Sequence, residues 1–583
     1  MFIRTVKVPS SRGTVLEYVR VVEAYRANGK VKQRVIADLG RKDFLLPLLP
    51  QLQRVLLGEP SFPDIDPNTI DFLDASTWGP VLVIRALCDQ LGLWDIFDRL
   101  LPHAKTGVSY TDRVFVLLAN RLVRPVSEHG LARWLETDFV CDRQGRRFVP
   151  HWHQHGRVQV HPRQLDAWYR TLDRLVKVKD KIEVALYQRL RDLFSLQPDL
   201  ILFDITSTYF EGHGPQGFAR HGYSRDGKAH NVQVVVGLVM VGGWPIAHYV
   251  WPGNRLDVTT VREVVADLTT RFAFARIVLV GDRGMVSVAN LDALTSDKHG
   301  YLVGLKRRRN AQLDAWLQQL DEPAWQDCPG GITAREKKDK PPRTRVQEVQ
   351  TNDATQRVFV IDSDERRQYE QSKRTQALER TRRRLLSVQN RVAKGTLTDP
   401  SAIGAAAERA LRAHQGYRYF GWEIRDGAFA FFEEPVHFER EKRLEGRYVI
   451  ATSERTMTAL DAVAWYKQLT EVERSFRRMK DVLGVRPLYH RVEPRVRGHI
   501  FVAALALLLQ TLLQRRLDEA GVALSAEQAL QALETIRHVR FQVHDETRSG
   551  ISAKNPRARQ VLNALKITEL RPPCPPAGET TVM

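Results

Sequence analysis

The spacing of hydrophobic residues changes along the chain, and each change marks a different kind of predicted element. Between 79 and 196 apolar residues recur at helical spacing between short polar turns, so this part is predicted to be helical. From 199 to about 308 the pattern gives strands and helices in the order β-β-β-α-β-α-β. That order predicts an α/β layer, with hairpins first and crossover helices after them.

The segments on either side of this run have weaker patterns, which still predict individual strands and helices. Residues 16–40 predict two strands joined at Asn28-Gly29, followed by a small helix at 42–57 and a Pro-rich linker at 59–68. After residue 306 the pattern predicts two hairpins separated by a long charged helix, and then a further strand at 446–454. The histidine-rich stretch 151–161 lacks cysteines or carboxylates at ligand spacing and is interpreted as a polar loop.

A helix is predicted next, because apolar residues recur at offsets of 3, 7, 10 and 14 from Leu469 to Leu483. Glu473 lies beside this apolar stripe, while Tyr466 and Lys480 stand seven residues to either side of it. By itself the pattern indicates an amphipathic helix with a solvated, charged flank.

Composition and charge narrow the class of partner. The chain has 583 residues, 43% of them hydrophobic, and a net charge of +20, which favours a polyanionic partner, most economically nucleic acid. Composition alone leaves an anionic membrane surface and an RNA–protein assembly open. Its four cysteines form no C-x-x-C pair, so a reducing cytoplasm fits. The apolar run at 500–509 is too short to span a bilayer and is predicted to be a buried core helix, with no membrane partner.

Two aspartates stand where an α/β protein places its chemistry. Asp204 interrupts an apolar strand, and Asp282 stands at the carboxyl end of the later strand in IVLVGDRG. Taken singly, Asp204 could be a hydrogen-bonded structural residue and Asp282 an ordinary turn residue. Taken with Glu473 on a later helix, they form the carboxylate set that hard divalent cations prefer, and two such ions can flank a phosphodiester.

The motifs resemble those of DDE transposases from bacterial insertion sequences, in the branch whose signature is Tyr-x2-Arg-x3-Glu-x6-Lys. Tyr466, Glu473 and Lys480 occupy three of the four signature places, and Leu469 stands where the signature has arginine. The resemblance extends to the segment 253–260 (GNRLDVTT), to GDRG at Asp282, to the residues following the signature, and to the N-terminal stretch 18–40.

The resemblance implies an α/β fold: an RNase H-like mixed-sheet catalytic core, interrupted by a β-rich and helical insertion and preceded by a mostly helical N-terminal region. The expected domains are a small α+β module (1–58), a helical DNA-binding region (70–197), the first part of the core (198–306), the insertion (307–446), the last part of the core (447–516), a C-terminal helical region (517–570) and a disordered tail (571–583).

The resemblance also implies the residues' roles. Asp204, Asp282 and Glu473 would be the catalytic residues and would hold two Mg²⁺ ions, with Mn²⁺ as an alternative, while the expected DNA contacts are Tyr466, Lys480, Arg477 and Arg283. Arg474 or Arg477 would substitute for the missing signature arginine. The expected partners are double-stranded transposon-end and target DNA and a second copy of the chain in a synaptic homodimer, in the cytoplasm of a bacterium.

The implied activity is cut-and-paste transposition: binding of terminal inverted repeats, metal-dependent hydrolysis of a phosphodiester, and strand transfer. Two alternatives stay open. One is an RNase H-like nuclease or resolvase that cuts DNA without joining it, and the other is a catalytically inactive, domesticated DNA-binding protein.

Overall fold

In the computed structural model the chain forms two compact units, one of residues 1–75 with 539–550 and one of 76–538 with 551–583. The structure describes residues 1–9, 15–57, 70–104, 107–149, 151–154, 157–196, 200–282, 284–285, 287–307, 310, 312–329, 342–543, 546–576 and 581–582.

The smaller unit contains the predicted N-terminal hairpin. Strands β1 (Phe2–Pro9), β2 (Val15–Ala27) and β3 (Lys30–Arg41) form an antiparallel sheet, followed by α1 (Lys42–Leu45) and α2 (Leu49–Leu56). Asn28 and Gly29 both have positive φ, as a two-residue hairpin turn requires. A second sheet has the order β20-β19-β4, with β4 at Ile70–Thr77, β19 at Arg537–Val543 and β20 at Glu546–Ile551, so the predicted C-terminal helical region contains a hairpin.

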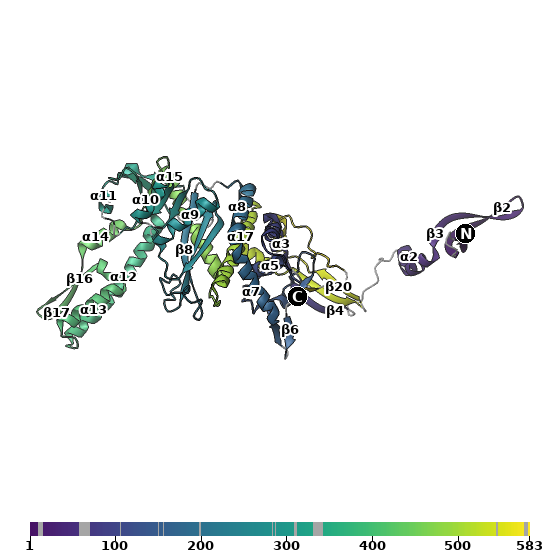
Figure 1. The fold of residues 1–583 in the computed structure, drawn as a ribbon, viewed down its shortest axis with the longest axis horizontal. Coiled ribbons are helices and arrows are strands. Elements are labelled where there is room, and N and C mark those ends of the chain that lie inside the picture. The colour runs from purple at the N-terminus through teal and green to yellow at the C-terminus, as the bar shows by residue number, and fades with distance from the viewer. Residues whose placement is uncertain are drawn as a thin grey trace. The chain divides into compact units, whose positions relative to one another are not determined.

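A nine-stranded mixed sheet forms the centre of the larger unit (Figure 1). Its order is β10 (Trp244–Pro252), β9 (Gln233–Val241), β8 (Leu200–Tyr209), β11 (Val278–Gly281), β12 (Gly300–Gly304), β18 (Arg447–Thr452), β15 (Arg357–Ser363), β14 (Thr344–Val349) and β13 (Gln326–Asp327). The neighbours β8, β9 and β10 are antiparallel, while β11 runs parallel to both β8 and β12.

Two helices connect the strands of this sheet as the sequence predicts. α9 (Val261–Arg271) lies between β10 and β11 in the chain, and α10 (Val288–Ser296) lies between β11 and β12. The predicted order β-β-β-α-β-α-β is therefore confirmed for residues 200–304. This mixed sheet fits the expected RNase H-like core.

The block between β12 and β18 is only partly separate from the core. The predicted hairpin at β14 and β15 joins the central sheet, because β15 pairs with β18 along six residue pairs. The remainder has its own hydrophobic core, formed between α12 (Asp364–Ala393), α13 (Pro400–Ala413) and the hairpin of β16 (Phe420–Arg425) and β17 (Ala428–Glu433). Figure 1 shows α12 and α13 side by side. The helix α11 (Leu313–Gln318) packs instead on β14, β15 and β18, in a separate hydrophobic cluster that also contains Leu444 of α14 (Pro435–Leu444).

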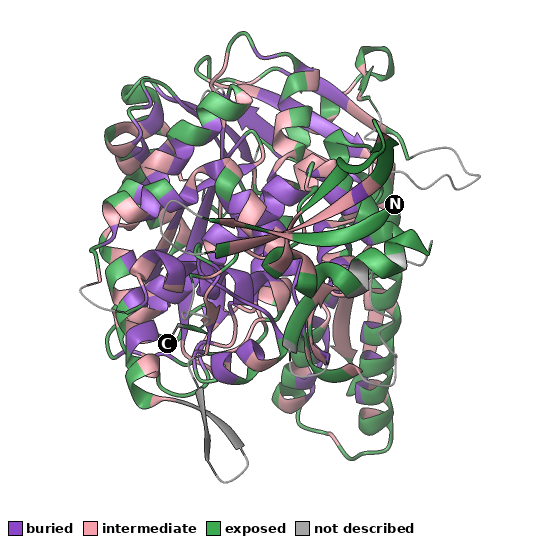
Figure 2. Ribbon diagram, turned by 90° about the vertical axis from the view of Figure 1, so that its right-hand side faces the viewer, coloured by how far each residue is buried: buried purple, intermediate pink, exposed green. Residues whose placement is uncertain are grey.

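The helical region surrounds α17 (Glu493–Glu519). Its helices are α3 (Gly79–Leu91), α4 (Leu93–Leu100), α5 (Tyr110–Val123), α6 (Leu131–Thr137), α7 (Pro162–Lys177) and α8 (Lys179–Phe194). α17 is apolar and long enough to cross a membrane, yet 89% of its most apolar window is buried within the protein. The prediction of a buried core helix is confirmed, because most residues of α17 are buried. Figure 2 shows buried segments in purple among exposed segments in green.

Shorter elements complete the larger unit and differ from expectation in two places. The histidine-rich stretch predicted as a loop forms a hairpin of β6 (His151–Gln154) and β7 (Arg157–Val160), whose side chains lie outside the described residues. Within the predicted disordered tail, β21 (Thr581–Val582) pairs with β5 (Arg147–Phe148). After α17 come α18 (Ala526–Leu533) and α19 (Pro556–Ala564).

The predicted amphipathic helix consists of α16 (Leu469–Arg477) followed directly by a π-helical turn at Arg478–Val482, and a separate helix, α15 (Ala459–Lys467), precedes it. Its apolar stripe is buried as predicted. The prediction of a helix is confirmed, although its last turn is π-helical, because apolar residues spaced by three or four positions fit one turn of α-helix or of π-helix equally well. The π-turn changes the direction of Lys480 relative to Glu473, and such turns often occur at functional sites.

A buried ionic network joins α8 to the sheet. Glu183 accepts hydrogen bonds from the backbone N–H and the Nδ1–H of His248 at 3.1 and 2.8 Å, and from Lys179 at 2.7 Å. Arg271 of α9 also donates to it. Burial alone would raise the pKa of Glu183, but Lys179, His248 and Arg271 outweigh burial and hold that pKa well below its usual value.

Candidate active site

Asp204 is held at the middle of β8 by the apolar residues around it. Its neighbours Phe203 and Ile205 are buried, and the strand itself lies inside the sheet, between β9 and β11. The pKa of Asp204 is raised to about 7, first by burial and then by the negative charges of Asp282 and Glu473. The carboxylates of Asp282 and Glu473 therefore lie close enough to Asp204 to repel its negative charge.

The register of the parallel strands explains how Asp282 comes to lie beside Asp204. Val280 of β11 pairs with Leu202 of β8. Two positions further along both strands stand Asp282 and Asp204, so they share one side of the sheet. Adjacent strands are about 4.8 Å apart, which brings these two backbone positions close together.

Glu473 reaches the same place from a helix. α16 packs on β8 and β9 through its buried face, which includes Val472 and Phe476, and Ser475 Oγ lies 3.6 Å from Met240 Sδ of β9. Glu473 follows Val472 and is itself exposed. The buried face thus fixes the helix on the sheet and turns the Glu473 carboxylate toward the two aspartates.

These side chains line a cavity of about 320 Å³. Its charged lining residues are the acids Asp204, Asp257, Asp282 and Glu473 and the cations Arg225, Arg477 and Lys480. The cavity therefore combines carboxylates that can hold cations with three cationic side chains that can contact phosphate oxygens.

The four residues expected to contact DNA do not all lie at the cavity. Arg477 and Lys480 line the cavity with the three acids. The ring of Tyr466 packs instead near Tyr448, at 6.0 Å between centroids, and its hydroxyl lies directly over Gly304, where an added Cβ would come within 2.2 Å. Arg283 lies outside the described residues.

Sequence reasoning missed Arg225 and Asp257, which form an ion pair at the cavity with Arg225 Nη2 donating to Asp257 Oδ2 at 2.6 Å. Arg225 lies in the connection 210–232 between the antiparallel strands β8 and β9. Hairpin loops usually have about two to five residues, and much longer ones are often functional. The length of this connection was the signal that could have drawn attention to Arg225.

This long connection is fixed by a crossing of three backbone segments. Arg220 and Gln233 exchange two backbone hydrogen bonds, and the Gln233 side chain donates to the carbonyl oxygens of Tyr223 and Gly253. A Cβ added at Gly253 would lie 2.1 Å from the Gln233 carbonyl oxygen. Glycine is therefore required at 253 by close backbone approach, and the crossing sets the position of the residues up to Arg225.

We expect Gly253→Ala to lower stability by about 1 to 3 kcal/mol, as overpacking of a close contact does. The activity of the cavity should fall as well, because the displaced backbone carries Arg225. Thermal unfolding and an assay of that activity measure the two effects. Gly550→Ala is the matched control, since its added Cβ meets its nearest atom at an ordinary 3.7 Å. Equal behaviour of the two variants would contradict this account of the crossing.

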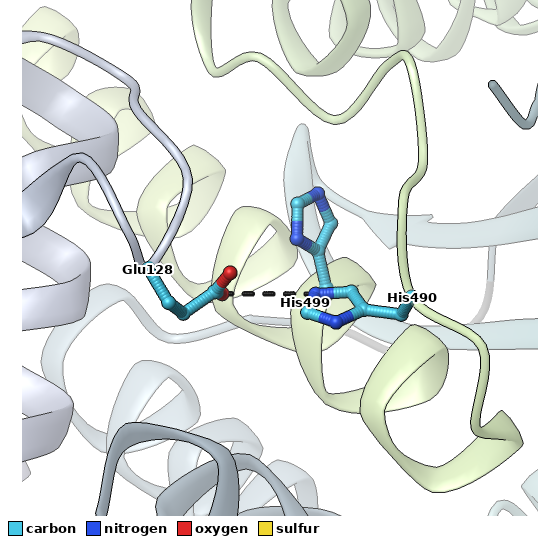
Figure 3. Close-up of side chains that lie close together, drawn as sticks. All are labelled: Glu128, His490 and His499. Carbon is cyan, nitrogen blue, oxygen red and sulfur yellow. Dashed lines mark ion pairs between the residues drawn. The ribbon is translucent and has the colours of Figure 1, made fainter. Parts of the chain in front are cut away.

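A second cluster of possible metal ligands lies away from this cavity and consists of Glu128, His490 and His499 (Figure 3). A Glu128 carboxylate oxygen lies 3.6 Å from Nε2 of His490. Arg121, however, approaches Nδ1 of His499 at 3.0 Å and also donates to the Gly484 carbonyl oxygen. Since a guanidinium can only donate, it occupies the Nδ1 lone pair. We interpret this cluster as a polar network that ties α5 to the segment following Lys480.

The carboxylate cavity, in contrast, fits divalent cations. All its acidic ligands are oxygen donors, which suit hard ions such as Mg²⁺. The mutual repulsion that raises the pKa of Asp204 would be offset by positive charge placed among Asp204, Asp282 and Glu473.

Comparison with known families shows the class of protein. Residues 197–509, more than half of the chain, match the family described as "Transposase DDE domain". The chain belongs to this family, whose members generally use divalent metal ions, and it is a DNA transposase.

A second match covers the start of the chain. Residues 3–59 match the family described as "IS1634 family transposase, N-terminal domain", which supports an insertion-sequence DDE transposase. Among solved structures, the chain is similar to a piggyBac transposase in a synaptic complex with hairpin DNA, with 8% sequence identity, a TM-score of 0.34, and coverage of 79% of this chain and 82% of that one. No curated protein sequence matches the chain.

Proposed function

We propose that this transposase mobilises an insertion sequence by a cut-and-paste route, in which it binds terminal inverted repeats, hydrolyses a phosphodiester and transfers the resulting strand. The observation that carries the proposal is the joint position of Asp204, Asp282 and Glu473 in one cavity, beside three cationic side chains. Carboxylates alone would suit any metal-dependent hydrolase. The neighbouring cations favour a phosphodiester as the substrate.

In this mechanism Asp204, Asp282 and Glu473 hold two Mg²⁺ ions. When bound, the ions supply an activated nucleophile and neutralise charge on the reacting phosphate. Lys480 and Arg477 bind nonbridging phosphate oxygens and orient the scissile bond. The apolar residues Ile205, Met285 and Phe476 in the lining restrict water around the carboxylates.

We place the chain in the branch with the Tyr-Arg-Glu-Lys signature, with one change of residue. Leu469, at the arginine place, is 8% exposed and belongs to the hydrophobic core, so its role is packing. Arg474 pairs with Glu471 on the helix surface, whereas Arg477 lines the cavity. We therefore assign the DNA contact of the missing arginine to Arg477.

The path of the DNA beyond the cavity follows from exposed cations. We propose that helical residues 70–197 contact the transposon end, and that Arg382, Arg383 and Arg384 on the exposed face of α12 contact the phosphate backbone. Arg307 is excluded from this role, since it is buried against Glu370 and the carbonyl oxygen of Leu444. Joining two ends requires two copies of the chain, in a synaptic homodimer formed on DNA in the bacterial cytoplasm.

Metal removal provides the first test. With a duplex carrying the element's inverted repeat, we expect cleavage and joining in Mg²⁺, loss of both with a chelator, and recovery when Mg²⁺ or Mn²⁺ is restored. Gel analysis of end-labelled DNA measures both steps. Unchanged cleavage after chelation and dialysis would refute the metal-dependent mechanism.

The same assay separates the alternatives. A nuclease or resolvase of this fold would release cut ends without joined product, and an inactive DNA-binding protein would shift the duplex on a gel without cutting it. Joined product that depends on the inverted repeat distinguishes the transposase from both.

A further inference from the structure

Lys480 is held on two sides before any DNA is bound. Its Nζ donates to Thr206 Oγ1 at 2.7 Å and to Asp226 Oδ1 at 2.8 Å. Thr206 stands two residues after Asp204 on β8, so the first bond places the ammonium beside the carboxylates. These bonds use two of the three N–H donors of a lysine ammonium. The side chain also lines the cavity, where the third donor can meet a phosphate oxygen.

Asp226 is the less expected of these two partners. Its side chain is 4% exposed, and one of its oxygens, Oδ1, accepts from both Lys480 and Arg486, the latter at 2.6 Å. The other oxygen, Oδ2, is buried and has no hydrogen-bond partner within the described part of the chain. Both oxygens of a buried carboxylate normally accept hydrogen bonds. The position of Asp226 therefore serves its ion pairs with Lys480 and Arg486 and leaves one of its own oxygens without a hydrogen bond within the described residues.

We propose that Asp226 is a positioning residue for DNA cleavage, which holds the ammonium of Lys480 beside Asp204, Asp282 and Glu473 so that Lys480 meets the scissile phosphate in a fixed place. The inference rests on the proposed function of that cavity. Asp226 stands behind Lys480 and acts through it, without itself contacting the DNA.

The need for such a residue follows from the chemistry of lysine. Its ammonium is a compact charge on a flexible stem with many rotamers, unlike the rigid fork of arginine. The π-helical turn at Arg478–Val482 places the stem, but only its end contacts can fix the charge. Burial lowers the pKa of Lys480, while the hydrogen bond that Lys480 donates to Asp226 raises it, so Asp226 also favours the charged form.

A double-mutant cycle on the full-length protein tests the proposal. With Mg²⁺ and an inverted-repeat duplex, Asp226→Asn should lower the single-turnover cleavage rate by about 100-fold, the usual effect of displacing a catalytic contact by about 1 Å. DNA affinity, measured by gel shift, should stay within about twofold, since the general phosphate contacts are retained. In a Lys480→Ala background the same Asp226→Asn change should have almost no further effect on the rate.

Three controls make the outcome decisive. Asp481→Asn removes the second carboxylate that pairs with Arg486. Because the Asp481 carboxylate does not contact Lys480, this variant should cleave at the wild-type rate. Asp226→Glu keeps the charge that Lys480 and Arg486 need for folding but moves it by one methylene, and should cleave more slowly than wild type even if Asp226→Asn fails to fold. Asp204→Asn should be inactive in the same assay.

A wild-type rate for Asp226→Asn or Asp226→Glu would overturn the inference, as would an equal loss for Asp226→Asn with and without Lys480. If Asp204→Asn cleaved normally, the proposed function itself would fail. If Asp204→Asn were inactive while Asp226→Asn cleaved normally, only the role of Asp226 would fail.

Discussion

Replacing any one of the three converging acids, as Asp204→Asn, Asp282→Asn or Glu473→Gln, is expected to lower the rate of DNA cleavage by at least about 10³-fold. Each change keeps the size of the side chain but removes a negatively charged oxygen ligand of the metal ions. Bound metal ions stabilise the transition state by several kcal/mol, and each 1.36 kcal/mol of that stabilisation corresponds to a factor of ten in rate. Cleavage of an inverted-repeat duplex under single-turnover conditions measures this loss.

These variants should lose catalysis while they keep DNA binding and stability. Gel-shift affinity should be retained, and thermal stability should be equal to or above that of wild type, because each change removes repulsion among carboxylates. Asp297→Asn, in the exposed turn after α10, is the matched control and should cleave at the wild-type rate. Full cleavage by any of the three variants would show that its carboxylate does not belong to the catalytic set.

The largest expected loss of stability comes from Glu183→Gln in the network beneath β10. This change leaves the cations of Lys179 and Arg271 without their buried carboxylate, and breaking such a pair costs about 3 to 5 kcal/mol. Thermal unfolding should show a fall of the melting temperature by about 3 to 5 °C for a cooperative unit of this size. Asp180→Asn provides the control, because Asp180 pairs with the same two cations but is 70% exposed. A similar fall in both variants would contradict the role given to burial.

The difference between wild type and Glu183→Gln should also depend on pH. The pKa of Glu183 lies lower in the folded protein than in the unfolded chain, where it is about 4.3. A group of this kind stabilises the fold above its unfolded pKa, and the stabilisation is lost as pH falls toward the folded pKa. The gap in melting temperature should therefore be widest above about pH 5 and narrow below about pH 4. A gap that widened in acid would exclude this linkage.

The sequence was a good guide where local pattern decides structure. The alternation of strands and helices from 200 to 304 followed from apolar periodicity, and the parallel register of β8 and β11 then placed Asp204 and Asp282 together. The burial of Leu469 and Phe476 followed from the same periodicity. The catalytic and DNA-contact roles stay predictions, as do the domain boundaries.

Other features depend on contacts between distant parts of the chain, which local pattern does not reveal. The pairing of β15 with β18 joins residues about ninety positions apart, and a hairpin signal could not show that it would enter the central sheet. Arg225 and Asp226 lie in an irregular connection with no periodicity, so only the fold shows that they reach Asp257 and Lys480. The π-turn leaves hydrophobic spacing unchanged and was invisible for that reason.

The place of β18 limits how this transposase could be made smaller. β18 leads toward α16 and Glu473, and it pairs with β12 on one side and with β15 on the other. Deleting the whole block from 307 to 446 would turn β18 into an open edge strand, prone to pairing with other molecules. The outer half of α12, together with α13 and the β16–β17 hairpin, has a hydrophobic core of its own. A shortened enzyme should therefore lose that portion and keep β14 and β15 as permanent scaffold.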